Sequence, residues 1–173
     1  MGDLYLMCGC PGSGKSTFLK NKIKQNNDKN VIISRDEIRF SIVHPNEPYF
    51  SHEDEVVNIF WDKINTALAE GKDVFVDQTS LTVKSRKWLL QHVTGYTYAN
   101  LIWIDEDLDT CLDRNEKRKG TRAYVPRDDV KRMHSQFVIP SLNEGFDYIF
   151  RYNSKEDKIF YKGGCATMTP KRR

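Results

Sequence analysis

The chain has 173 residues, which is enough for one hydrophobic core, and we expect a single domain over residues 1–173. Its net charge of +3 is too small to indicate a nucleic-acid-binding protein by charge alone. No stretch approaches 18 apolar residues, and the N-terminus lacks a basic segment followed by a long apolar one. We therefore expect neither a membrane span nor secretion, but a cytoplasmic protein with reduced cysteines.

A glycine-rich turn follows the first predicted strand, the apolar run Leu4–Cys8. The turn reads Gly9-Cys10-Pro11-Gly12-Ser13-Gly14-Lys15-Ser16, which matches the phosphate-binding pattern G-x-x-x-x-G-K-[ST] at every fixed position. A helix is predicted from Lys15 to Lys24, so backbone N–H groups and the helix dipole face one anion. We expect ATP or another nucleoside triphosphate to bind here, with the Lys15 ammonium on the β- and γ-phosphates and the Ser16 hydroxyl on Mg²⁺. The residues expected to contact the donor are Gly12, Ser13, Gly14, Lys15, Ser16 and Thr17.

Short apolar runs alternate with amphipathic segments in the rest of the chain, which is the pattern of βαβ units. Further strands are predicted at Val31–Ser34, Val74–Asp77, Ala99–Ile104 and Tyr148–Tyr152, with Lys158–Tyr161 as a candidate edge strand. The clearest helix has Ser51 as its N-cap and ends at Gly71. Other helices are predicted at Glu37–Ile42, Thr82–Val93, Leu108–Lys117 and Arg127–Phe137. These elements predict an α/β fold with a central parallel sheet of about five strands flanked by helices.

Acidic residues follow three of the predicted strands. Asp36 comes after the second strand, Asp77 ends the third, and Asp105 follows the fourth. Because ligands of an open α/β sheet bind at the carboxyl ends of the strands, we expect all three to face the triphosphate. Asp36 is either the base that accepts the proton of a substrate hydroxyl or only a cap or charge at a helix start. Asp77 and Asp105 are alternative holders of Mg²⁺, and the pattern does not choose between them.

A second basic feature lies between residues 114 and 132. The cluster comprises Arg114, Lys117, Arg118, Lys119, Arg122, Arg127, Lys131 and Arg132. A charge run is usually a solvated helix face, but Gly120-Thr121 interrupts the helical pattern here. The break favours a lid over approximately residues 114–126 that closes cations over the triphosphate and excludes water. The basic tail, residues 164–173, is interpreted as a frayed end.

Several of these segments, in order and with similar spacing, resemble the 5′-kinase domain of phage polynucleotide kinase. The segments are Gly9–Thr17, Ser34–Arg39, Val76–Leu81, Arg114–Thr121, Val125-Pro126 and Val130–Met133. The resemblance covers most of the chain and implies a P-loop kinase fold with a basic lid. The phage enzyme continues into a phosphatase domain with a D-x-D-G-T motif, which this sequence lacks. The resemblance is therefore to the kinase half alone.

The resemblance also implies roles on the acceptor side. Asp36 matches the general base for the 5′-hydroxyl, and Arg39 matches the arginine that binds the phosphate next to the acceptor nucleoside. Asp77, Gln78 and Thr79 match the segment that faces the acceptor. The alignment of this segment leaves open whether Asp77 or Gln78 faces the acceptor.

On the donor side, Arg118 matches the lid arginine that reaches the nucleotide. Lys119 is inserted before Gly120 relative to the family pattern, so Lys119 is an alternative for this position. Arg114 matches a residue that stacks on adenine in such enzymes.

These inferences predict an ATP- and Mg²⁺-dependent kinase that acts on the 5′-hydroxyl of DNA or RNA, as in nucleic-acid end repair. Asp36, Lys15 and Arg118 would be catalytic, and Ser16 with Asp77 would hold the metal. A kinase for a small molecule, a nucleotide sugar or an aminoacyl-tRNA would share the donor site. A nucleotide-dependent binding module without transfer is a further alternative. Arg39 favours the polynucleotide, because an acceptor without a phosphodiester has no need of it.

Overall fold

A computed structural model of the chain describes residues 1–23 and 28–163. The predicted end of the first helix at Lys24 and the basic tail 164–173 lie outside these residues. The strands are β1 (Leu4–Cys8), β2 (Asn30–Ser34), β3 (Asp73–Asp77), β4 (Ala99–Ile104), β5 (Tyr148–Asn153) and β6 (Lys158–Gly163). The α-helices are α1 (Lys15–Phe18), α2 (Arg35–Ile42), α3 (Glu53–Ala69), α4 (Val83–His92), α5 (Leu108–Glu116) and α6 (Arg127–Ser135). A π-helix, η1 (Leu19–Ile23), and a 3₁₀ helix, η2 (Leu142–Glu144), complete the described elements.

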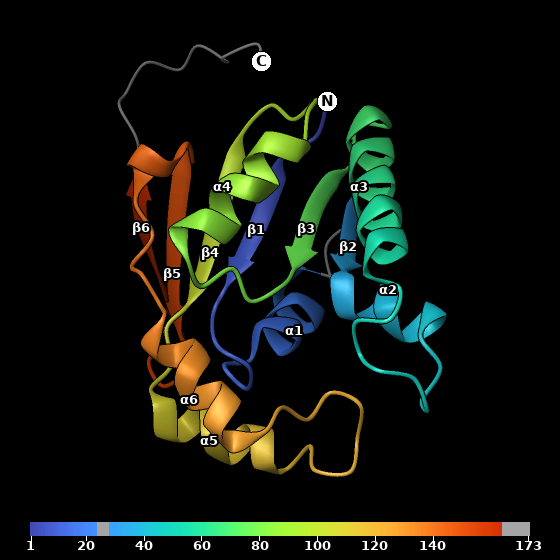
Figure 1. Cartoon of the computed structure of the whole chain (residues 1–173). Helices are drawn as coiled ribbons and strands as arrows, with labels where there is room; N and C mark the ends of the chain where they lie inside the picture. Colours follow the sequence, from blue (N-terminus) through green and yellow to red (C-terminus); the bar gives the residue numbers. More distant parts are fainter. Residues whose placement is uncertain (24–27, 164–173) are drawn as a thin grey trace.

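The six described strands form one sheet in the order β2-β3-β1-β4-β5-β6 (Figure 1). The first five are parallel to their neighbours, and β6 pairs antiparallel with β5 at the edge. This confirms the predicted α/β fold and the parallel sheet, with the candidate edge strand as its sixth member. Parallel strands joined by helices require both sheet faces to be covered.

Side chains of β1 alternate between two hydrophobic clusters, as expected for a strand buried on both faces. Leu4, Leu6 and Cys8 pack with buried residues of α3 and α4, including Phe60 and Leu89. Met7 packs on the opposite face with residues of α1 and η1. The β1 strand therefore lies inside the sheet with both faces covered, and the segment that follows it begins in the core.

Helix starts differ in detail from the predictions. The α2 helix begins after Ser34, whose hydroxyl accepts a hydrogen bond from the Glu37 N–H, so Ser34 rather than Asp36 is the cap. The N-cap of α3 is His52, and the predicted cap Ser51 donates its hydroxyl to the Pro48 carbonyl instead. The first predicted helix is α-helical only over Lys15–Phe18 and continues as the π-helix η1.

The carboxyl ends of β1, β2 and β3 lie side by side at one edge of the sheet (Figure 1). Ser34 at the end of β2 is in register with Asp77 at the end of β3. The segment after β1 therefore meets the segments after β2 and β3, although they are far apart in the sequence. Among the described residues, no helix is long and apolar enough to cross a membrane.

Candidate active site

The phosphate loop, residues 9–16, turns tightly between β1 and α1. Gly12 has a φ of 82°, and a Cβ at this position would lie 2.2 Å from the Cys111 carbonyl oxygen. Gly14, with a φ of 102°, caps α1. Both backbone conformations favour glycine, and the packing against α5 leaves no room for a side chain at Gly12. The local sequence thus produces the compact turn that a phosphate-binding loop requires.

The Lys15 side chain folds back over this loop. Its ammonium donates to the carbonyl oxygens of Gly9 at 2.9 Å and Cys10 at 3.0 Å. Lys15 is 8% exposed, and its burial lowers the pKa of the ammonium, an effect that the Asp77 carboxylate opposes. The Ser13 hydroxyl is buried without a hydrogen-bond partner among the described residues. A buried cation beside an unpaired hydroxyl at a glycine turn fits a phosphate group of ATP.

Ser16 and Asp77 meet beside the loop, where the Ser16 hydroxyl donates to Asp77 Oδ2 at 2.7 Å. Mg²⁺ prefers oxygen ligands and commonly binds through one or two protein groups together with substrate phosphates and water. This hydroxyl and carboxylate therefore fit a magnesium ion that arrives with a nucleoside triphosphate.

Asp105, the alternative metal holder, has a different partner. Its carboxylate accepts from Arg151 Nε at 2.7 Å and pairs with Arg151 Nη2 at 2.5 Å, and Arg151 lies within β5. The structure thus brings Asp77 and not Asp105 to Ser16.

The segment after Asp77 is attached to the phosphate loop through its backbone. The Thr79 carbonyl accepts a hydrogen bond from the Gly9 N–H at 2.9 Å. The acceptor roles of Gln78 and Thr79 stay predictions.

Asp36 lies in the first turn of α2, and its side chain is 62% exposed. Its Oδ1 accepts from Arg39 Nη1 at 2.8 Å and from the Tyr49 hydroxyl at 2.5 Å. Burial, together with the hydrogen bond to Asp36, raises the pKa of Tyr49, which keeps this hydroxyl protonated as a donor. The Asp36 carboxylate is therefore oriented by two donors while one side stays open, an arrangement suited to a general base.

The predicted phosphate ligand Arg39 is largely occupied. Its side chain is 4% exposed, and the Glu53 carboxylate accepts from Nη2 at 2.7 Å and from Nε at 3.2 Å. Its guanidinium also lies 4.4 Å from the Tyr49 ring centre and 5.4 Å from that of Phe50. We call Asp36, Arg39, Tyr49, Phe50 and Glu53 the Arg39 cluster. In this arrangement Arg39 orients Asp36, and its contact with an acceptor phosphate stays a prediction.

The predicted lid is the segment that joins α5 to α6. Arg114 in α5 reaches back to the phosphate loop, donating to the Ser13 carbonyl at 3.1 Å and to the Ser154 hydroxyl at 3.0 Å. The buried Glu106 carboxylate lies 3.8 Å from the Arg114 guanidinium and accepts from the Ser154 N–H at 2.9 Å. Arg114 therefore closes one side of the phosphate loop.

A cavity of about 390 Å³ lies between the phosphate loop and α5. Arg118 lines this cavity together with Thr17 and Arg114, whereas Lys119 does not. The Lys119 side chain is 71% exposed and pairs with Glu116 at 3.3 Å. Of the two alternative lid cations, Arg118 has the position from which a bound nucleotide can be reached, and its catalytic role stays a prediction.

Arg122, further along the lid, crosses to α2. Its guanidinium donates to the carbonyl oxygens of Phe40 at 3.0 Å and Val43 at 2.7 Å, and it lies 4.5 Å from the centre of the Phe40 ring. A cation at the carboxyl end of a helix also interacts favourably with the helix dipole. Arg122 thus holds the lid against the helix that carries Asp36.

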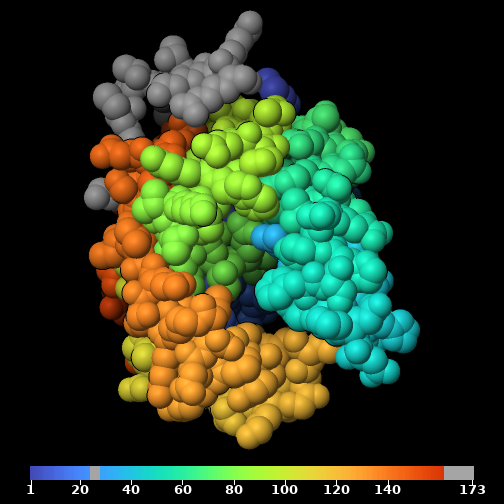
Figure 2. Space-filling view, viewed as in Figure 1, coloured from blue at the N-terminus to red at the C-terminus, as the bar shows by residue number. Residues whose placement is uncertain are grey.

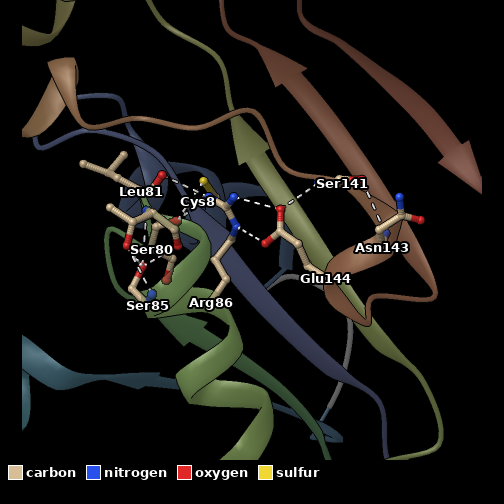
Figure 3. A network of polar contacts seen from close by, with 9 residues as sticks. Cys8, Ser80, Leu81, Ser85, Arg86, Ser141, Asn143 and Glu144 are labelled. Carbon is tan, nitrogen blue, oxygen red and sulfur yellow. Dashed lines mark hydrogen bonds and ion pairs between the residues drawn. The ribbon is translucent and has the colours of Figure 1, made fainter.

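Arg86 in α4 is central to a second group that the sequence did not reveal (Figure 3). The side chain is fully buried, and its Nε and Nη2 pair with Glu144 at 2.6 and 2.9 Å. Its Nη1 donates to the carbonyl oxygens of Ser80 at 3.1 Å and Leu81 at 3.0 Å, and the Cys8 thiol also reaches the Ser80 carbonyl. We call these five residues the Arg86 cluster. It fixes the end of the segment after β3, where Ser80 has a φ of 46°.

The residues that the sequence reasoning missed are partners of residues that it named. Glu53 and Tyr49 contact Asp36 or Arg39, and Glu106 contacts Arg114. No motif marks these positions, because each is defined by contact with a residue distant in the chain.

The surface view shows a hollow between the segment with α2 and α3 and the segment with α4 (Figure 2). The lid lies along one side of this hollow, and atoms of the N-terminal segment form its floor.

Comparison with known proteins gives a family match over most of the chain. Residues 4–140 match the family described as "AAA domain". L-seryl-tRNA(Sec) kinase of Methanococcus maripaludis is 29% identical over 151 residues, which are 83% of this chain and 56% of that protein. A protein of Acanthamoeba polyphaga mimivirus, named "Putative bifunctional polynucleotide phosphatase/kinase", is 27% identical over 85% of this chain and 32% of its own length.

A solved structure resembles the whole described fold. A chain of the Pnkp1/Rnl/Hen1 RNA repair complex superposes with a TM-score of 0.68 over 97% of this chain and 51% of that chain, at 22% identity. The chain thus spans only about half or less of the length of these relatives. At this level of identity the structural likeness shows the fold alone.

Proposed function

Because the chain belongs to the AAA domain family and has a P-loop kinase fold, we propose that it is an ATP-dependent phosphotransferase for the 5′-hydroxyl of DNA or RNA. We also propose that residues 1–173 act as one kinase domain, with the lid at approximately residues 114–126. The names of the two curated relatives described above contain the word kinase, which supports phosphoryl transfer as the reaction.

The observation that carries the proposal is the oriented Asp36 carboxylate at the sheet edge that also carries the phosphate loop. Two donors hold Asp36, and Ser34, two residues before it, is in register with Asp77, which contacts Ser16. A nucleotide-dependent switch has no need of a fixed carboxylate at this place, whereas a kinase needs a base for the acceptor hydroxyl.

The remaining roles follow from charge and position. Lys15 neutralises charge on the donor phosphates, and Arg118 does so from the lid. Ser16 and Asp77 would hold Mg²⁺, which when bound neutralises charge on the phosphates of ATP. Asp36 orients the acceptor hydroxyl and takes its proton as the oxygen attacks the γ-phosphorus, and ADP leaves. The lid excludes water, which would otherwise compete with the acceptor.

The test is transfer of label from γ-labelled ATP to a 5′-hydroxyl oligonucleotide. The variant Asp36→Asn keeps the shape of the side chain but cannot take the proton, so kcat should fall by about 10²- to 10⁴-fold. Glu37→Gln is the matched control, because Glu37 is an exposed carboxylate in the same turn of α2 and should not affect kcat. Equal rates for Asp36→Asn and the parent would refute Asp36 as the base.

The identity to L-seryl-tRNA(Sec) kinase favours a second candidate, in which the acceptor hydroxyl belongs to an amino acid esterified to tRNA. Both candidates use the same donor site and the same base. A competition assay separates them: an excess of 5′-hydroxyl oligonucleotide should suppress phosphorylation of seryl-tRNA if the oligonucleotide is the preferred acceptor, and should leave it unchanged otherwise.

A further inference from the structure

Two large aromatic side chains of the Arg39 cluster are exposed beside Asp36. Phe50 is 68% exposed and Tyr49 is 40% exposed. Their rings meet edge to face with centres 4.8 Å apart, and the Tyr49 ring contacts Phe40 in the same way at 6.3 Å. Exposed aromatic surface beside a polar site is unfavourable in water and commonly marks a binding site.

These rings are held in place rather than free to turn. The Tyr49 hydroxyl is fixed by its 2.5 Å hydrogen bond to Asp36, and the Arg39 guanidinium supports both rings from the protein side. Glu53 fixes Arg39 in turn, with both carboxylate oxygens within hydrogen-bond distance of Nη2. A pre-positioned ring loses little conformational entropy when a ligand packs against it.

The position of the rings restricts what can cover them. An acceptor hydroxyl at Asp36 places the rest of the acceptor against the neighbouring side chains, which are the buried Arg39 and the exposed ring of Tyr49 with Phe50 next to it. The single polar atom of these rings, the Tyr49 hydroxyl, is already bound to Asp36. The exposed ring faces therefore offer apolar π-surface and no free hydrogen-bonding group, which suits the flat face of a nucleobase better than the hydroxyl groups of a sugar or polyol.

We propose that the exposed Phe50 ring, supported by Tyr49, is a stacking platform for the nucleobase of the acceptor's terminal nucleotide. This inference rests on the proposed function and adds the group that the site recognises beyond the hydroxyl. Stacking is tolerant of sequence because every base has a π-face, so the platform would give affinity for an acceptor end without base preference. The cation Arg122 beside Phe40 adds favourable charge for the acceptor phosphates on the lid side.

The test is steady-state transfer to two 5′-hydroxyl oligonucleotides that differ only in an abasic first nucleotide. Phe50→Ala should raise the KM for the normal acceptor about 5- to 150-fold, the range of one base stack, and leave the KM for ATP unchanged. Phe50→Trp should keep the parent KM, while Phe50→Leu, which is apolar but has no π-face, should resemble Phe50→Ala. Phe160→Ala is the matched control, because Phe160 is an exposed aromatic residue on β6, and it should change nothing.

The abasic acceptor identifies the contact. It should raise the KM of the parent as much as Phe50→Ala does, and have no further effect on Phe50→Ala. An equal abasic effect in both proteins, or a Phe50→Ala variant with the parent KM, would overturn the stacking platform alone. A parent protein that transfers no label to any oligonucleotide would instead refute the proposed function.

Discussion

Arg86 and Arg39, near the carboxyl ends of the strands, each pair with a glutamate. The two pairs differ in how far their side chains are exposed to solvent. In the Arg86 cluster both partners are buried, with side-chain exposures of 0% for Arg86 and 5% for Glu144. In the Arg39 cluster, Arg39 is 4% exposed, Glu53 is 28% exposed and Asp36 is 62% exposed. The Arg86 pair is therefore buried inside the protein, whereas the Arg39 cluster includes a carboxylate that is exposed to solvent. An arginine–glutamate pair therefore lies wholly inside the protein in the Arg86 cluster, whereas in the Arg39 cluster it holds the exposed carboxylate that we propose as the base.

The largest expected effect on stability is for the Arg86 cluster. Arg86→Met leaves the Glu144 carboxylate buried without its partner, so the free energy of unfolding should fall by about 3–5 kcal/mol. For a chain of this length the melting temperature should drop by roughly 6–20 °C. The double variant Arg86→Met with Glu144→Met removes both charges and should recover part of this loss, as calorimetry or circular dichroism can show. A single variant that melts with the parent would mean that the pair contributes nothing.

A smaller effect on stability is expected for the Arg39 cluster. Glu53→Gln removes the charge of the carboxylate that pairs with both Arg39 and Arg35. Asp36 still pairs with Arg39 and water can reach this site, so the loss should be about 1–3 kcal/mol. The kcat for transfer should fall as well, because Arg39 then orients Asp36 less firmly. Glu55→Gln, on an exposed turn of the same helix, is the control. If Glu53→Gln lowered stability as much as Arg86→Met, the contrast between the two clusters would be wrong.

The lid contact should have a weaker effect again. Arg122→Ala removes a cation at the carboxyl end of α2, whose interaction with the helix dipole is worth about 0.3–1 kcal/mol near the surface. It also removes two hydrogen bonds, which water can replace at this exposed position. The lid should then open more often, and chymotrypsin should cleave after Tyr124 about two- to fivefold faster. Lys119→Ala, which changes an exposed lid cation paired with Glu116, should leave the cleavage rate unchanged. Unaltered cleavage in Arg122→Ala would remove Arg122 as the lid contact.

The Cys8 thiol of the Arg86 cluster should react very slowly with alkylating reagents in the folded protein. Burial raises the pKa of Cys8 to about 12, so at pH 8 only about one molecule in 10⁴ carries the thiolate that reacts. Iodoacetamide should therefore label the peptide containing Cys8 only after denaturation, as mass spectrometry of digests can measure. Cys111, whose pKa burial also raises to about 12, should behave alike. Labelling of folded Cys8 at the rate of a free cysteine would show that this cluster opens readily.

The phosphate loop and the sheet could be predicted because their signals are local. A glycine pattern between an apolar run and a helix involves only neighbouring residues. The predicted bounds of the strands after β1 likewise lie within one or two residues of the observed bounds. The placement of acidic residues at the strand ends also followed from strand direction alone. Helix caps were less certain, since Ser34 and His52 replaced the expected residues through short-range hydrogen bonds that several polar residues can make.

Tertiary structure decided which of these residues meet. The sequence left Asp77 and Asp105 equivalent, and the structure gave Asp77 to Ser16 and Asp105 to Arg151. It also showed Arg39 bound to Glu53 and Arg86 to Glu144, pairs separated by 14 and 58 residues. A local pattern records periodicity and turn chemistry, whereas an ion pair depends on which loops the sheet order brings together. The amino-acid sequence by itself therefore determined the phosphate loop, because its signal is local, and only the folded chain determined how the residues proposed to face the acceptor are arranged.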